Sequence, residues 1–320
     1  MVITPAVENR IAVTVNEIVD EADGVRSFVL TSSDGGTLPS WEPGAHIDIE
    51  LPNGIVRQYS LCGDVGDRTR WRIAVLREPE SRGGSEFFHD SLTVGAQLIA
   101  GGPRNHFPLV DAETYRFIAG GIGVTPILPM ARHLDSIGRP WELLYGGRRL
   151  GSMAFIEELG KLNGKVTVSP EDAHGLLDLD SYLQDLSAST AVYCCGPEAL
   201  LNAVEKHASG WQVGDLHIER FAPKEGALEG KSTSFEVEAV QSGVTVTVGP
   251  DESIADALDE AGVFVYTTCG EGTCGTCETV VLEGVPDHRD SMLTEAERAA
   301  NNKMMVCCSR ALSPRLKLDL

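Results

Sequence analysis

Three cysteines within nine positions constrain this 320-residue chain more than any other feature. Cys269, Cys274 and Cys277 lie in the segment TTCGEGTCGTCETVV, where glycines separate them. An adjacent pair, Cys307 and Cys308, follows near the end of the chain. Clustered cysteines that do not form a disulfide framework more often bind metal or take part in redox chemistry. The loop therefore predicts a centre with thiolate ligands.

The spacing of these cysteines is typical of a plant-type [2Fe–2S] cluster, with four residues between the first two ligands and two between the next. Each iron takes two cysteine sulfurs beside the bridging sulfides, so a fourth cysteine is required. Both Cys307 and Cys308 follow at a suitable distance, and the residues alone leave that choice open. Gly270, Gly272 and Gly275 allow a tight turn in which backbone amides point at sulfur.

Two other interpretations of the cysteines are weaker. A structural zinc site usually needs two short pairs of cysteine or histidine, and only one such pair is present. Cysteines that were buried only as small apolar residues would not need a glycine at every second position between them. The pattern therefore favours the iron–sulfur cluster.

The charge balance limits the partners. The chain has 47 Asp and Glu against 26 Lys and Arg, a formal charge of −21. That sign argues against nucleic acid. From Ser232 onward there are fifteen acidic and six basic residues. This excess serves solubility or steers a basic partner, and both readings stay open.

Targeting signals are not apparent in the sequence. No apolar run approaches the length of a membrane span, and the first residues do not resemble a secretory signal. We expect a cytoplasmic, monomeric protein that binds neither membrane nor nucleic acid.

The order of predicted elements indicates three modules. Residues 11–107 contain short β-rich runs broken by turn sequences, which predicts an antiparallel barrel. Strands then alternate with helices, among them one expected over TPILPMARHLDSIG and one over SMAFIEELGKL. Such alternation predicts a parallel sheet with both faces covered. After a stretch of small and charged residues, two strands, a helix and the cysteine loop form a third, α+β module. The predicted domains are a flavin-binding barrel (1–108), an NAD(P)-binding α/β domain (109–224), a linker (225–233) and a ferredoxin domain (234–320).

The cluster needs a source of single electrons. A reduced nicotinamide delivers two electrons as hydride, and a flavin is the usual cofactor that accepts hydride and releases electrons one at a time. In IAGGIGVTPIL, Gly120, Gly121 and Gly123 lie between a strand and a helix, where backbone can approach a pyrophosphate. Pro126 replaces the third glycine of the usual fingerprint. A second strand-end turn, CCGPEALL, opens another helix. Together the two turns predict a dinucleotide site.

In the barrel, RQYSLCG places Arg57 and Tyr59 on one face of a strand and Ser60 on the other. The segment RGGSEFFHD opens a helix with two glycines and Ser85. That turn is either a phosphate cradle or an ordinary N-cap.

Taken together, these segments resemble the phthalate dioxygenase reductase and vanillate demethylase reductase family. The resemblance extends from RQYSLCG through GGPRNHFPL, AGGIGVTPIL, YCCGPEAL and ERFAP to the cysteine loop. It implies FMN rather than FAD, and it implies Cys307 as the fourth cluster ligand after Cys269, Cys274 and Cys277. The implied FMN residues are Arg57, Gln58, Tyr59, Ser60, Ala74, Val75, Leu76, Arg82, Gly83, Gly84, Ser85, Thr125 and Phe221. The implied nicotinamide-nucleotide residues are Gly120, Gly121, Gly123, Arg148, Cys195, Gly196 and Pro197.

Within this resemblance, two residues are implied in hydride transfer. Thr125 reaches the flavin from the nucleotide module, and Cys195 lies near the hydride-donating carbon. The turn after the second sheet strand departs from the family, because it reads YGGRRLGSMAF with Arg148 and Arg149 where relatives often carry an acidic residue. We expect NADH, with NADPH open because an arginine there can receive a 2′-phosphate.

The sequence thus predicts an oxidoreductase that passes electrons from NADH through FMN and a [2Fe–2S] cluster to a separate terminal oxygenase. A Rieske-type aromatic dioxygenase or demethylase is the expected acceptor, and a haem monooxygenase is the alternative. An iron–sulfur redox sensor without turnover is the alternative of another class, but it would not need the flavin residues.

Overall fold

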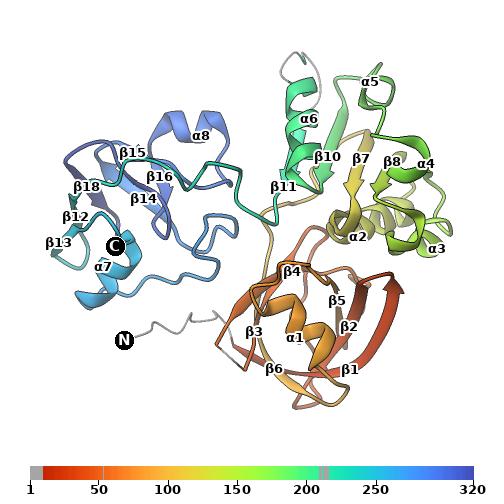
Figure 1. Ribbon diagram of the computed structural model, residues 1–320, viewed down its shortest axis with the longest axis horizontal. Helices are drawn as coiled ribbons and strands as arrows, with labels where there is room; N and C mark the ends of the chain where they lie inside the picture. The colour runs from red at the N-terminus through yellow and green to blue at the C-terminus, as the bar shows by residue number, and fades with distance from the viewer. Residues whose placement is uncertain (1–9, 53, 209–210, 212–215) are drawn as a thin grey trace. The chain divides into compact units, whose positions relative to one another are not determined.

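The computed structural model describes residues 10–52, 54–208, 211 and 216–320. Internal contacts divide the chain into two compact units, and the boundary along the chain lies between Glu219 and Arg220. The first unit contains a β-barrel and a parallel α/β sheet, and the second contains the cysteine loop (Figure 1). None of the described helices is long and apolar enough to cross a membrane.

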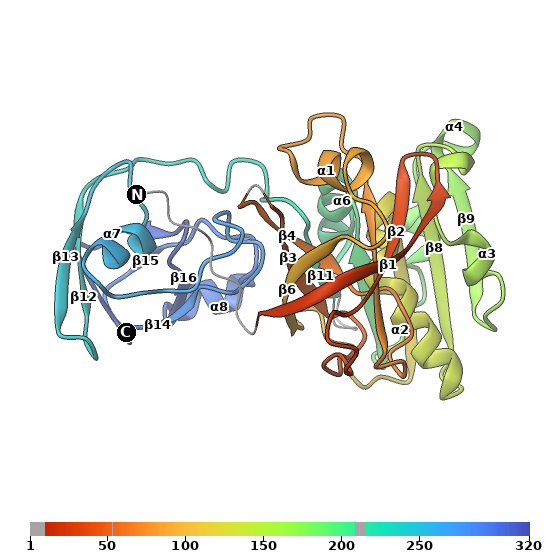
Figure 2. The ribbon, with the colours of Figure 1, turned by 90° about the horizontal axis from the view of Figure 1, so that it is seen from below.

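The barrel consists of six antiparallel strands in the order β4-β3-β6-β1-β2-β5. They are β1 (Ile11–Ala22), β2 (Val25–Ser32), β3 (His46–Glu50), β4 (Val56–Ser60), β5 (Arg70–Leu76) and β6 (Gln97–Arg104). A bridge between Leu61 and Ile73 joins the two edges and closes the barrel. The short helix α1 (Gly84–Asp90) buries Phe88 against the interior, with its ring 5.0 Å from that of Phe28. The predicted antiparallel barrel is confirmed, and Figure 2 shows its strands from a second side.

The α/β sheet is entirely parallel, as predicted, with strand order β11-β10-β7-β8-β9. Its strands are β7 (Thr114–Gly120), β8 (Trp141–Gly147), β9 (Lys165–Pro170), β10 (Thr190–Cys195) and β11 (Leu216–Glu219). Helix α2 (Val124–Ser136) packs on one face, while α5 (Leu179–Tyr182) and α6 (Glu198–Ala208) pack on the other. Because strand residues alternate between faces, Cys195 joins the core under α2 and Cys194 joins the core under α6.

The helix expected over SMAFIEELGKL is much shorter than predicted. A 3-10 turn, η2 (Leu150–Ser152), precedes α3, which covers only Ile156–Leu159. Phe155 has φ 63°, a left-handed conformation that a right-handed helix cannot include, and Gly160 caps the helix after only four residues. A further short helix, α4 (Glu171–His174), follows β9.

The barrel and the α/β sheet share a core and a network of ion pairs. Arg72 of β5 binds Glu21 of β1 at 2.6 Å and Glu158 of α3 at 2.8 Å. Arg132 of α2 also binds Glu158 and donates to the carbonyl of Cys62 at 3.1 Å. One carboxylate therefore holds an arginine from each module, which fixes the barrel against the sheet.

The second unit is an α+β module around its own apolar core. A five-stranded sheet runs in the order β13-β12-β18-β14-β16. Its elements are β12 (Phe235–Ala239), β13 (Val244–Val248), α7 (Ile254–Glu260), β14 (Glu278–Glu283), β15 (Pro286–Asp287), α8 (Glu295–Ala300), β16 (Lys303–Met305), β17 (Arg310–Ala311) and β18 (Arg315–Leu318). Helix α7 begins where Ser253 accepts from the amide of Asp256, as expected for an N-cap.

The segment between the α/β sheet and β12 is bound to the second unit. The amide of Lys224 donates to Ser291 Oγ at 2.8 Å. Arg289 donates to the carbonyl of Lys231 at 3.0 Å, and Arg310 donates to that of Thr233 at 3.2 Å. The stretch predicted as linker, residues 225–233, thus has fixed partners near its carboxyl end, at Lys231 and Thr233.

The network around Glu158 gives a stability prediction. Glu158→Gln leaves Arg72 and Arg132 without their shared carboxylate, and we expect a loss of about 1.5–3 kcal/mol in unfolding free energy. Urea unfolding followed by fluorescence measures it. Glu157→Gln is the matched control, because Glu157 is exposed and pairs only with Lys161 on the surface. Equal unfolding midpoints for the two variants would contradict the network's role.

Candidate active site

The cysteine loop folds as a tight turn around its sulfurs. Cys269 Sγ accepts from the amides of Glu271 at 3.4 Å and Thr273 at 3.5 Å. The hydroxyls of Thr268 and Thr276 lie 3.4 and 3.2 Å from Cys274 Sγ. Backbone and hydroxyl dipoles are thus directed at sulfur, which stabilises negative charge there.

Glycine is required where this loop crosses the segment before α8. Gly272 has φ 69°, and a Cβ there would lie 2.7 Å from the Cα of Asp290 and 2.5 Å from Cys308 Sγ. The Ser291 amide donates to the Gly272 carbonyl at 2.9 Å. Any side chain at position 272 would displace the loop from Asp290 and Cys308.

The four predicted ligands are brought together. The neighbouring thiols of Cys274 and Cys307 lower the pKa of the Cys269 thiol. The neighbouring thiols of Cys269, Cys277 and Cys308 raise the pKa of the Cys307 thiol. Several thiols in one site cannot all ionise unless a cation compensates them. The donor set therefore fits an iron–sulfur cluster.

The arrangement of sulfurs differs from that of a single-metal site. Among the described residues, no three His, Cys, Asp or Glu side chains are placed to hold one metal ion. A dinuclear cluster needs only two cysteine sulfurs on each iron.

In the barrel, Arg57 lies against the glycine turn that opens α1. Its guanidinium donates to the carbonyl of Arg82 at 3.2 Å, and its side chain packs on Gly84, where a Cβ would lie 2.9 Å from Arg57 Cγ. Gly83 has φ 83° and precedes the helix without a side-chain cap. Ser85 Oγ accepts from the Glu78 amide at 3.1 Å. A cation and a backbone turn therefore lie side by side, as a phosphate requires.

Other predicted flavin residues line the same module. Ser60 is buried, and its hydroxyl has no hydrogen-bond partner among the described residues. Tyr59 packs edge-on against Phe88 at 4.9 Å, and burial raises the pKa of its hydroxyl. Gln58 donates to Asp48 at 2.9 Å. An orphaned buried hydroxyl indicates a missing polar partner, since such groups are normally bonded.

Strand β5 lies between the barrel interior and the α/β sheet. Val75 belongs to the barrel core, whereas Ala74 and Leu76 face the core shared with the sheet. The strand contacts the glycine turn η1 (Gly121–Gly123). These three residues are thus placed beside the expected nucleotide site.

The two strand-end turns of the sheet pack backbone to backbone. A Cβ on Gly123 would collide with the carbonyl of Cys195, and one on Gly120 would lie 2.6 Å from Pro197 Cδ. A Cβ on Gly196 would lie 3.0 Å from the Cα of Gly120. The turns require glycine because the backbone of each turn occupies the space that a side chain on the other would need. Both turns lie at the carboxyl edge of the sheet.

Thr125 and Cys195 are both buried beside these turns. Thr125 Oγ1 donates to the carbonyl of Ile122 at 2.9 Å. Burial, with a smaller contribution from Glu219, raises the pKa of the Cys195 thiol, which therefore stays protonated. Arg148 is exposed directly after β8, and Phe221 is exposed in the second unit.

Comparison with known proteins agrees with this arrangement. Residues 237–312 match the family model of the 2Fe-2S iron-sulfur cluster binding domain. The chain is 42% identical over 313 residues to phenoxybenzoate dioxygenase subunit beta of Ectopseudomonas oleovorans, covering 97% of each protein. A solved structure of phthalate dioxygenase reductase is 36% identical, with 98% of both chains covered and a TM-score of 0.71. The chain belongs to the phthalate dioxygenase reductase and vanillate demethylase reductase family.

A fourth similarity is to a longer protein. An intact type IV self-sufficient cytochrome monooxygenase superposes with a TM-score of 0.88 at 42% identity. The match covers 97% of this chain but 41% of that one. Members of this reductase family are oxidoreductases with flavin and [2Fe–2S] domains, and this chain has both modules.

Sequence reasoning missed Glu219, the last residue of β11. The parallel register places it opposite Cys195, 24 positions earlier in the chain. Its Oε2 is buried without a partner among the described residues, and burial raises the pKa of the carboxyl from 4.5 to about 8. Only the strand pairing brings the two residues together, so no local pattern reveals it.

The choice between the adjacent cysteines gives one prediction. Cys307 lies close enough to the predicted ligands Cys269 and Cys277 to have its pKa raised by them, whereas Cys308 packs on Gly272. We expect Cys307→Ser to lose the cluster and Cys308→Ser to keep about two iron atoms per chain. Iron and sulfide assays of the purified variants measure this. Retention of the cluster in Cys307→Ser together with its loss in Cys308→Ser would reverse the assignment.

Glu219 gives a prediction of pH dependence. Its folded pKa lies above the unfolded value, so folding favours the protonated form. The stabilisation is complete below pH 4.5 and declines as the pH rises toward 8. Glu219→Gln should flatten this decline in urea midpoints measured between pH 5 and 8, whereas Glu171→Gln on the exposed start of α4 should follow the wild type. Parallel curves for all three proteins would rule out a buried, protonated carboxyl.

Proposed function

We propose that this protein transfers electrons from NADH, through FMN and a [2Fe–2S] cluster, to a separate terminal oxygenase. The observation that carries the proposal is the combination in one chain of the cysteine loop, the barrel turn beside Arg57 and the paired glycine turns of the sheet. Bound flavin would accept the two electrons of a hydride and release them singly, and the cluster would carry one at a time.

The residues of the chain position the reactants rather than exchange protons with a substrate. Arg57 and the turn Arg82–Ser85 would bind the phosphate of FMN. Thr125 and Cys195 border the place where nicotinamide and flavin would meet, and the neutral thiol of Cys195 adds no charge there. Holding the donor carbon close to the acceptor lowers the barrier of such a transfer.

A Rieske-type aromatic dioxygenase or demethylase is the acceptor we propose. The names of several relatives support it, among them vanillate O-demethylase oxidoreductase and phthalate dioxygenase reductase. The similarity to a self-sufficient cytochrome monooxygenase favours a haem monooxygenase as the second candidate. Reconstitution with purified oxygenases of both kinds tests the two candidates directly.

The visible spectrum of the purified protein tests the cofactors. Flavin and iron–sulfur bands that bleach when NADH is added are expected. Release of the flavin by acid, followed by chromatography, distinguishes FMN from FAD. A cluster spectrum without flavin would instead favour a redox sensor.

The order of electron transfer gives a mutational prediction. Cys274→Ser should abolish reduction of cytochrome c, because that reaction depends on the cluster. Ferricyanide reduction by NADH should persist, since it needs the flavin alone. If both activities disappeared while the circular dichroism spectrum stayed native, the proposed order would be wrong.

A further inference from the structure

Electron transfer of the proposed kind leaves a proton behind. A hydride carries one proton and two electrons, so its transfer from NADH needs no proton from the protein. When the two electrons then leave singly toward the cluster, the proton remains at the flavin site and has to reach water. The proposed function therefore requires a route for this proton from the flavin site to the surface.

Ser60 and His46 lie opposite each other on the neighbouring barrel strands β4 and β3. The Leu61 amide donates to the Ala45 carbonyl at 2.8 Å, which marks the two residues as a non-hydrogen-bonded pair of the ladder. In such a pair both side chains point to the same face and approach each other closely. Both residues are buried. The Ser60 hydroxyl, which has no hydrogen-bond partner among the described residues, thus has an imidazole as its cross-strand neighbour.

A second imidazole continues from His46 to the surface. The ring centroid of His106 lies 5.7 Å from that of His46, and the two rings are inclined by 32°. At this separation the ring nitrogens can be joined directly or through one water molecule. His106 is exposed, so the pair of rings connects the buried face of β3 with solvent.

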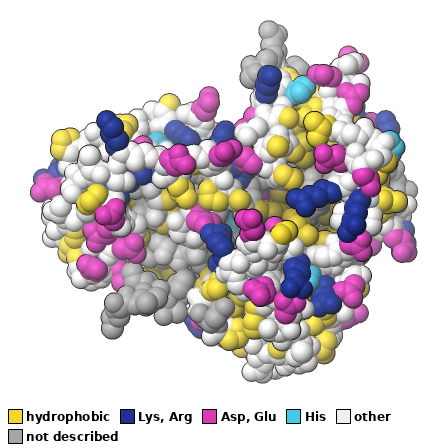
Figure 3. Space-filling model, viewed as in Figure 1, with side chains coloured by type: hydrophobic (Ala, Val, Ile, Leu, Met, Phe, Trp, Pro, Cys, Tyr) yellow, Lys and Arg dark blue, Asp and Glu magenta, His cyan; other side chains and the backbone are white. Residues whose placement is uncertain are grey.

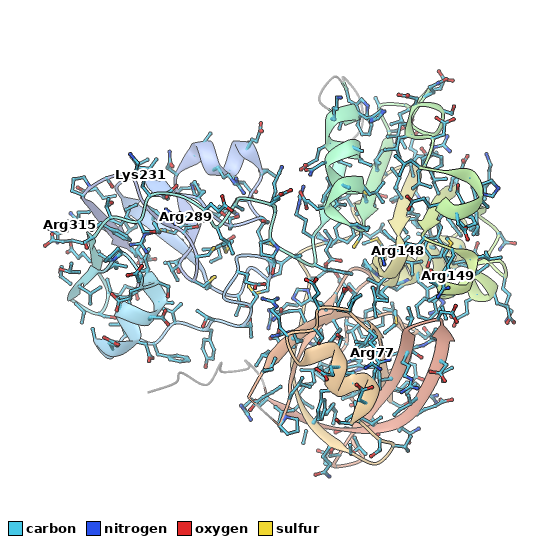
Figure 4. All side chains as sticks on the ribbon, viewed as in Figure 1. Arg77, Arg148, Arg149, Lys231, Arg289 and Arg315 are labelled. Atoms are coloured by element: carbon cyan, nitrogen blue, oxygen red, sulfur yellow. The ribbon has the colours of Figure 1, made fainter. Side chains whose placement is uncertain are left out.

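The two histidines are held by contacts between the segment before β3 and the segment after β6. The side-chain amide of Asn105 donates to the Pro43 carbonyl at 3.0 Å. Gly44 has φ 92°, and a Cβ there would collide with the carbonyl of Phe107. The backbones beside the two rings are therefore in direct contact, which fixes the separation of the rings. Figure 4 shows the barrel strands with their side chains as sticks.

Among the described residues, the charged groups that face His46 are paired with each other. Asp48, two positions along β3 and fully buried, forms an ion pair with Arg104 of β6 at 2.6 Å and accepts from Gln58 at 2.9 Å. Arg104 is the neighbour of His46 across the strands on its other side. Histidine is the side chain whose ordinary pKa lies near neutral pH. The two imidazoles are therefore the groups on this face that can accept and release a proton during turnover.

We propose that Ser60, His46 and His106 form a proton route from the flavin site to water. The Ser60 hydroxyl accepts the proton as it gives its own to His46, and His46 passes a proton to His106, which releases it. One proton leaves for every two electrons, and each side chain returns to its starting state. This inference rests on the proposed function, because the proton arises only if hydride reaches a flavin beside Ser60.

Histidine NMR of the isotope-labelled, flavin-loaded protein tests the route without turnover. We expect the imidazoles of His46 and His106 to titrate as a coupled pair. His106→Gln should therefore change the titration of His46, and Ser60→Ala should shift the ring signals of His46. Figure 3 shows other His side chains at scattered points of the surface. His174, exposed on α4, supplies the matched control, since His174→Gln should change neither titration.

Stopped-flow kinetics separate the route from hydride transfer. NADH should reduce the flavin equally fast in the wild type, His46→Gln and His106→Ala, because hydride brings its own proton. Reoxidation by cytochrome c should slow about tenfold or more in both variants, with a larger solvent isotope effect. Added imidazole should restore the rate of His106→Ala, whose site is exposed, but not that of His46→Gln. The exposed His106→Ala keeps the test valid if the buried substitution prevents folding.

Three results would overturn the route: independent titration of the two imidazoles, unchanged reoxidation in His106→Ala, or slowing that shows neither an isotope effect nor rescue by imidazole. Failure of NADH to reduce the flavin of the wild type would instead overturn the proposed function. The NMR titrations would in that case still decide whether the three side chains are coupled.

Discussion

Repulsion between ionised sulfurs is the constraint on which the second unit depends. Cys269, Cys274, Cys277 and Cys307 crowd into one site where thiolates would repel each other in the absence of positive charge. The amides of Glu271 and Thr273 offset a small part of that repulsion. Iron supplies the rest, so folding of the loop and assembly of the cluster are coupled. The glycines matter for the same reason, since they bring donors to sulfur without side chains in between.

The first unit has a different constraint, because it would have to hold two cofactors at a fixed position relative to each other. Its barrel and sheet share an apolar core, and Glu158 joins an arginine from each. A flavin bound by the barrel and a nucleotide bound by the sheet would thereby keep their relative position. The close packing of Gly123 on the Cys195 carbonyl adds to this rigidity, because neither turn can shift alone.

Local sequence predicted the features that local chemistry determines. Cysteine spacing, the barrel strands and the helix before the cysteine loop depend on residues close together in the chain. The predicted length of α3 was wrong because Phe155, which packs in the shared core, has a left-handed conformation that interrupts the helix. The pairing of Cys195 with Glu219, and the hydrogen bond from Arg289 to the Lys231 carbonyl, join segments that are distant in the chain. No periodicity or composition signals such contacts, so the structure was needed to find them.

The hydrogen bonds of the connecting segment have a consequence for electron flow. Strand β11 ends at Glu219 and the Lys224 amide is already bonded to Ser291 of the second unit, so at most four residues lie between these two points. Four residues extend to at most ~14 Å. A tether this short would keep the flavin of the first unit and the cluster of the second at a high effective concentration, however dilute the protein is. Electrons would then pass within one molecule much faster than between two, and crowding in the cell would hardly alter that rate.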